Sequence, residues 1–95
     1  MKILAIEKEV RDTTKEQFAP HLKEEAKRVF ELKKAGIIRE IYFGQQLHNA
    51  VMILECDNEA GANEILNTLP LVREKLIKFE LTTLIPYDGF DRLNL

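Results

Sequence analysis

Four segments of the chain alternate apolar and polar residues or are rich in β-branched and aromatic residues, as β-strands are. Residues 2–7 contain a short apolar run that is typical of a central strand covered on both faces. Residues 37–43 and 49–56 flank a turn that begins at Gly44, which predicts a β-hairpin. The alternating residues 77–85 predict the last strand, and Pro86 follows it.

Two segments between these strands have the periodicity of amphipathic helices. The first helix is expected from about Pro20 to residue 35, with Leu22, Val29 and Leu32 on one apolar face and Gly36 just past its end. The second is expected to begin at a cap at residue 57 or 58. Its apolar residues recur at i, i+3, i+4 and i+7, and Pro70 ends it.

The order strand, helix, strand, strand, helix, strand is that of a ferredoxin-like α+β domain, with a four-stranded antiparallel sheet and helices on one face. We expect one such domain over residues 1–95. Both strands of the hairpin carry apolar residues on both faces, so the face away from the helices also needs cover. A second sheet from another copy is the economical cover, which predicts a homodimer or a larger homo-oligomer.

Composition excludes several classes of function. The net charge is −2 and acidic and basic residues are interspersed, so we expect no nucleic-acid partner. No apolar run is long enough to cross a membrane, and the first apolar run is too short for a signal peptide. A single cysteine, Cys56, fits a reducing compartment, and we expect a cytoplasmic protein. The chain has no serine nucleophile and no glycine-rich phosphate loop, and we assign no cofactor.

Glu25 is the first candidate for chemistry, because it falls inside the apolar stripe of the first helix. A carboxyl group that faces the sheet should have a raised pKa or a positive partner, and such an acid suits proton transfer next to a carbonyl. A structural salt bridge is the alternative. His21, four residues earlier, lies on the same helix face and is a candidate proton shuttle. Because no third ligand accompanies this pair, we assign no metal site.

The predicted hairpin supplies the other candidates. With its turn centred on residues 45 and 46, Phe43 pairs with His48, and Arg39 shares a face with His48 at about 13 Å. Arg39 is then a candidate anchor for a ligand carboxylate, or else it pairs with an acidic neighbour such as Glu25 or Glu55. Catalytic candidates are therefore Glu25, His21 and His48, and substrate-binding candidates are Arg39, Tyr42 and Phe43.

Tyr42 projects to the face opposite Arg39, which favours a subunit interface or a barrel interior. Beyond the last strand, Tyr87 and Phe90 are expected to anchor a tail on a partner chain, with a pocket lid as the alternative.

The ordered pattern Gly36, Arg39-x-x-Tyr42, His48, Leu69-Pro70-Leu71, Phe79-Glu80 and Leu84 resembles muconolactone delta-isomerase and its small relatives. These belong to the dimeric α+β barrel group, so the resemblance implies two ferredoxin-like sheets packed face to face with the helices outside. It also implies a glutamate at the place of Glu25. The family pattern has tryptophans where this chain has Ile38 and Tyr42, and an arginine where it has Phe43.

These observations support three hypotheses. The first is a cofactor-independent, isomerase-like enzyme that acts on a carboxylate- or lactone-containing small molecule. The second is a non-catalytic binding or oligomerisation module, in which a direct Glu25–Arg39 bridge would replace a cavity. The third is a heme- or oxygen-using member of the same fold group, with His48 or His21 as ligand.

Overall fold

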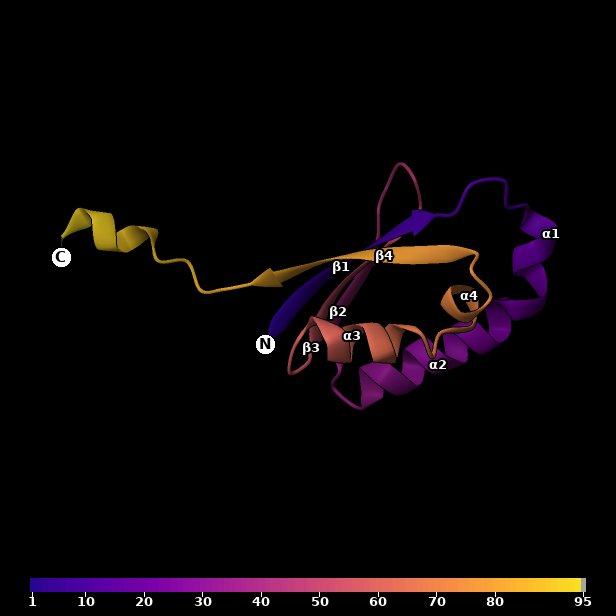
Figure 1. Ribbon diagram of the computed structural model, residues 1–95, viewed down its shortest axis with the longest axis horizontal. Helices are drawn as coiled ribbons and strands as arrows, with labels where there is room; N and C mark the ends of the chain where they lie inside the picture. The colour runs from indigo at the N-terminus through magenta and orange to yellow at the C-terminus, as the bar shows by residue number, and fades with distance from the viewer. Residues whose placement is uncertain (95) are drawn as a thin grey trace.

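Four strands form one antiparallel sheet in the order β2-β3-β1-β4 in the computed structural model, which describes residues 1–94 (Figure 1). The strands are β1 (Lys2–Glu9), β2 (Ile38–Phe43), β3 (Ala50–Glu55) and β4 (Ile77–Leu84). Each lies within two residues of the segment that the alternation predicts. The ferredoxin-like βαββαβ fold predicted from the sequence is confirmed.

The helices lie on one side of this sheet, as Figure 1 shows for α2, α3 and α4. Their bounds are α1 (Lys15–Phe18), η1 (Ala19–His21), α2 (Leu22–Lys34), α3 (Glu59–Leu66), α4 (Pro70–Arg73) and η2 (Gly89–Leu93). The main helix α2 begins two residues after Pro20, because that proline takes part in a short 3-10 turn. Within residues 1–94, no helix is long and apolar enough to cross a membrane.

Local signals fix the ends of the helices. Gly36 has a φ of 82° just beyond α2, and the N–H of Ile37 donates to the carbonyl of Leu32 at 3.0 Å, so the chain turns directly into β2. The Asn58 Oδ1 accepts from the N–H of Gly61 at 2.8 Å and caps α3. Both helices lie on the same side of the sheet (Figure 1).

The main core lies between the sheet and the helices. It consists of residues that are at most 2% exposed, namely Ile3, Ala5, Ile38, Met52 and Leu54 from the strands and Leu32, Ala62, Leu66 and Leu69 from the helical side. Leu32 is the buried residue of α2, whereas Leu22 on the same helix is 52% exposed. The apolar stripe of α2 therefore continues beyond the core.

The register of the hairpin differs from the predicted one by two residues. Phe43 lies opposite Ala50, not His48, and Ile41 lies opposite Met52. The loop is longer than predicted because the N–H of Gly44 donates to the carbonyl of Asn49 at 2.8 Å and closes it there. Arg39 has no partner in this register, since the register shifts between Ile38 and Glu40 and places Arg39 in a bulge.

The other face of the sheet carries apolar side chains that no described element covers. Ile3 and Ala5 point to the helices, so the alternate residues Leu4 and Ile6 point away, as do Val51 and Ile53 on β3. All four are partly exposed. Figure 1 shows this side of the sheet without a helical layer.

Residues 85–94 form an arm that leaves the end of β4 and stands away from the body (Figure 1). The radius of gyration is 15.4 Å, against about 12 Å for a compact domain of this length. Tyr87 and Phe90 pack edge to face with ring centroids 5.0 Å apart, yet they are 70% and 65% exposed. The arm therefore has local order but little cover.

Candidate functional site

A cavity of about 800 Å³ lies between α2 and the sheet. Its walls are mostly apolar, and Leu22, Phe30 and Phe43 contribute to them although each is more than half exposed, so they form an open rim. The charged or titratable side chains that line it, apart from Tyr42, are Glu7, Glu9, Glu25, Lys33 and His48. This volume is in the range of small-molecule sites.

Glu25 lies in the first turn of α2 and lines the cavity, which confirms its predicted position facing the sheet. Its Oε1 accepts a hydrogen bond from the backbone N–H of Leu71, at the start of α4, at 2.9 Å. Burial raises the pKa of this carboxyl group, the Leu71 N–H opposes the rise, and the charge of Glu7 adds to it. Arg73 and His21 lower the pKa of Glu25 by smaller amounts.

Glu7 also lines the cavity, although the sequence analysis did not single it out, nor Glu9 and Lys33. Glu7 lies on β1 in phase with Ile3 and Ala5, so it points to the helix side. Its Oε1 accepts from the N–H of Ala50 at 2.8 Å, which ties the side chain to β3. The spacing of Ile3, Ala5 and Glu7 along the predicted strand is visible in the sequence, and it indicates that Glu7 faces the helices.

His48 and Phe43 come together although their predicted pairing is wrong. Their rings stack with centroids 4.0 Å apart and an interplanar angle of 18°. His48 lies in the hairpin loop with a φ of 54°, and its N–H donates to the carbonyl of Gly44 at 2.9 Å. The left-handed turn thus directs the imidazole back over the strand, and both residues line the cavity.

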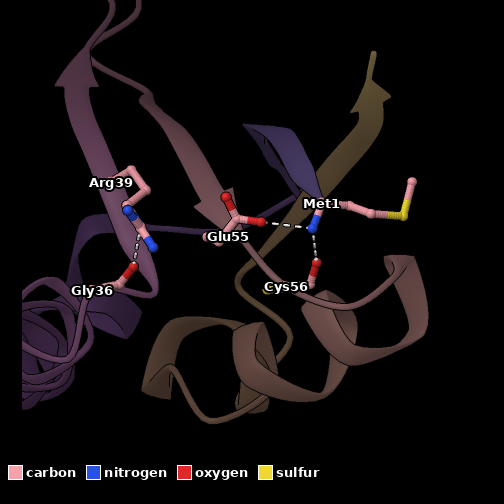
Figure 2. Close-up of polar contacts among 5 residues, drawn as sticks. All are labelled: Met1, Gly36, Arg39, Glu55 and Cys56. Carbon is pink, nitrogen blue, oxygen red and sulfur yellow. Dashed lines mark hydrogen bonds and ion pairs between the residues drawn. The ribbon is translucent and has the colours of Figure 1, made fainter. Parts of the chain in front are cut away.

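Arg39 lies outside the cavity. Its Nε donates to the carbonyl of Gly36 at 2.6 Å, as Figure 2 shows. Its charge helps to lower the pKa of Glu55, although the main cause there is the hydrogen bond from the Met1 amine at 2.6 Å. In residues 1–94 no ion pair joins Arg39 to Glu25, so the structure does not bring these two predicted site residues together.

Tyr42 and His21 lie at the margins of the site. Tyr42 contributes to the lining, but it is 61% exposed and its hydroxyl donates to the Glu40 Oε1 at 2.9 Å, which raises the pKa of Tyr42. His21 is the residue before α2 and does not line the cavity. No hydrogen bond joins His21 to Glu25 in the described part of the chain. His21 acts on Glu25 only through its charge, which lowers the pKa of Glu25 by a small amount.

The arrangement can hold a small apolar molecule against a carboxyl group with a raised pKa and beside a stacked imidazole. Across residues 1–94, no three His, Cys, Asp or Glu side chains gather as ligands for a metal ion. Cys56 is half-buried at the end of β3, and burial raises the pKa of its thiol. It does not line the cavity.

The fold is shared with a solved structure, the crystal structure of muconolactone isomerase at 3.3 Å resolution. The superposition has a TM-score of 0.74 and covers 94% of this chain and 93% of that one, at 14% sequence identity. No protein-family model matches the chain, and no curated protein is similar to it in sequence. At this identity the likeness shows the fold alone.

Proposed function

We propose that the cavity between α2 and the sheet is the active site of a small isomerase-like enzyme that acts, without a cofactor, on a carboxylate- or lactone-containing small molecule. The observation that carries this proposal is the placement of Glu25 in a mostly apolar cavity of about 800 Å³. Burial raises the pKa of this carboxyl group, so it holds a proton more readily than an exposed carboxyl group and is suited to act as an acid/base catalyst.

The proposed reaction is proton transfer next to a carbonyl group. The hydrogen bond from Leu71 fixes one oxygen of Glu25 and leaves the other free for a substrate proton. The Phe43–His48 stack offers a flat face and a ring nitrogen to a small planar ring, and we assign both residues to the site. Tyr42 contributes to the rim. His21 influences Glu25 through its charge, and Arg39 has no part in the proposal because it lies outside the cavity.

The alternative of a non-catalytic assembly module called for a Glu25–Arg39 bridge and no cavity. A cavity beside Glu25, together with an Arg39 that bonds to Gly36 instead, supports the enzyme over that alternative. The shared fold with muconolactone isomerase gives the first substrate to try.

The test follows two lactones by proton NMR in D₂O, muconolactone and the neutral α-angelica lactone. The wild-type protein is expected to exchange or move the hydrogen next to the carbonyl faster than buffer does. Glu25→Gln keeps an acceptor for the Leu71 N–H but cannot carry the proton, so its rate should fall at least about 100-fold. Glu64→Gln, on the exposed surface of α3, serves as the matched control. Equal rates for Glu25→Gln and wild type would refute the assignment.

We further infer that the protein is a homodimer or larger homo-oligomer, as the resemblance to the dimeric α+β barrels implied. Two features support this inference: the uncovered apolar face formed by Leu4, Ile6, Val51 and Ile53, and the arm with its exposed Tyr87 and Phe90. A second sheet packed on the first would bury that face, and the arm would lie on the partner chain.

A further inference from the structure

Glu7 places a second carboxyl group in the cavity. Glu25 enters from α2, on the helical side, whereas Glu7 enters from β1, in the centre of the sheet. Each has one carboxyl oxygen held by a backbone N–H, from Ala50 for Glu7 and from Leu71 for Glu25. Both carboxyl groups therefore have a fixed orientation and one oxygen available to a bound molecule.

The surroundings of the two groups differ in a way that separates their roles. Burial and the negative charge of Glu7 both favour the protonated form of Glu25. Glu7 receives its hydrogen bond near the end of β1, where the neighbouring residues Lys8 and Glu9 are exposed. Two carboxyl groups that enter one cavity from opposite walls, one of them with its protonated form favoured, are suited to act as a general acid and a general base.

We propose that Glu7 is the general base and Glu25 the general acid of a 1,3-proton shift in a neutral unsaturated lactone. This assignment rests on the proposed function, and it adds a second catalytic residue and a substrate class to it. The resemblance and the comparisons point to no role for Glu7; its position on the cavity wall and its hydrogen bond to Ala50 carry the assignment.

The proposed step balances without an oxidant or a reductant. The Glu7 carboxylate takes a proton from the ring carbon next to the carbonyl, and the electron pair of that C–H bond forms a dienolate. The ring double bond shifts, and the far carbon takes the proton of the Glu25 carboxyl group. Glu7 then holds a proton and Glu25 is ionised, and exchange with water through the open rim restores both groups.

The charge of the cavity favours a neutral substrate. Besides Glu25, which the proposed step uses in its protonated form, the carboxyl groups of Glu7 and Glu9 line it, against the basic side chains of Lys33 and His48. Arg39, the guanidinium expected to hold a carboxylate, is outside. An anionic substrate would meet like charges in a partly desolvated site, whereas an uncharged ring would not.

The pH dependence of the site reflects all the charged groups around Glu25. These are Glu7 and Glu9 from β1, His48 from the hairpin loop, Lys33 from α2 itself, Arg73 from α4 and His21 from η1. Among the residues that act on its pKa, Glu7 is the acidic one, so removing its charge should lower the pKa of Glu25.

The test compares wild type, Glu7→Gln, Glu25→Gln and the control Glu64→Gln with α-angelica lactone as substrate. Glu7→Gln keeps an acceptor for the Ala50 N–H, and thermal melting checks that it folds. We expect kcat to fall at least about 100-fold while KM changes less than about threefold. In D₂O, the wild-type product should carry deuterium at the far carbon, because Glu25 draws its proton from water. A carbon-13 NMR titration should show a lower pKa for Glu25 in Glu7→Gln.

The outcomes separate this inference from the proposed function. If Glu25→Gln is inactive but Glu7→Gln stays within about threefold of wild type, the role of Glu7 is refuted and the proposed function stands. Protium retained at the far carbon in most of the product would also refute it, since one carboxyl group would then carry the same proton across. A preference of more than tenfold for the same ring bearing a carboxymethyl group would overturn the neutral substrate class. A wild-type protein inactive on every lactone would overturn both proposals.

Discussion

Glu25 combines a backbone hydrogen bond, which favours its charged form, with burial, which opposes it. Burial is the larger effect, so the pKa of Glu25 is raised in the folded protein above its ordinary value of 4.5. The folded state therefore holds this proton more tightly than the unfolded state does. The resulting stabilisation is complete below pH 4.5 and is lost as pH rises through the folded pKa.

Glu25→Gln should remove that loss of stability. The glutamine keeps the acceptor for Leu71 but has no proton to release, so the variant should gain in Tm relative to wild type between pH 4 and pH 8. Thermal melting across this range, with Glu64→Gln as control, measures the difference. A Tm difference between Glu25→Gln and wild type that is the same at both ends would mean that Glu25 has no raised pKa.

Two glycines allow a matched test at the scale of the helices. Gly36, past the end of α2, has a φ of 82° and nothing within 4 Å of an added Cβ, so Gly36→Ala would be strained by backbone conformation alone. The expected loss is about 1 kcal/mol, or about 5 °C in Tm. Gly61→Ala lies inside α3, where its Cβ would meet only the Asn58 Oδ1 at an ordinary 3.5 Å. It should raise Tm by about 3 to 5 °C, because alanine favours a helix by about 0.5–1 kcal/mol over glycine. Shifts of the same sign would contradict the predicted helix ends.

The strands and helices were predictable from the sequence because their signals are local. The alternation of β1, the cap at Asn58 and the left-handed Gly36 each act over a few residues. The hairpin register was not predictable in the same way. It depends on the Gly44–Asn49 hydrogen bond and on the left-handed His48, which lengthen the loop by two residues without changing the strand pattern.

The candidate site was predictable only in part, because some of its residues are placed by local patterns and others by contacts between distant segments. Glu25 followed from helical periodicity, whereas Arg39 was misplaced because a bulge at that residue changes the relation between the two strands. Glu7 was missed although its phase on β1 places it among the inward-facing residues. The distance from helix to sheet, and so the volume of the cavity, depends on packing over the whole molecule, and no residue spacing specifies it.

At the scale of the whole molecule, the uncovered face of the sheet predicts the state of assembly. Light scattering at micromolar concentration should return at least twice the 11.0 kDa mass of one chain. Ile53→Lys places a charge in the centre of that face, which water tolerates and an interface does not, so this variant should dissociate. Ala60→Lys, on the exposed side of α3, is the matched control and should assemble as wild type does. A monomeric wild-type protein would contradict the inferred interface.

Catalysis by Glu25 in the cavity is tested most directly by the kcat of Glu25→Gln, measured on the lactone that the wild-type protein converts fastest. The side chain changes by one atom and keeps its hydrogen bond to Leu71, so only its capacity to carry a proton is lost. The expected kcat is at least about 100-fold below that of wild type, with Glu64→Gln unchanged. A kcat for Glu25→Gln equal to that of wild type would show that the cavity does not use Glu25 as its acid/base.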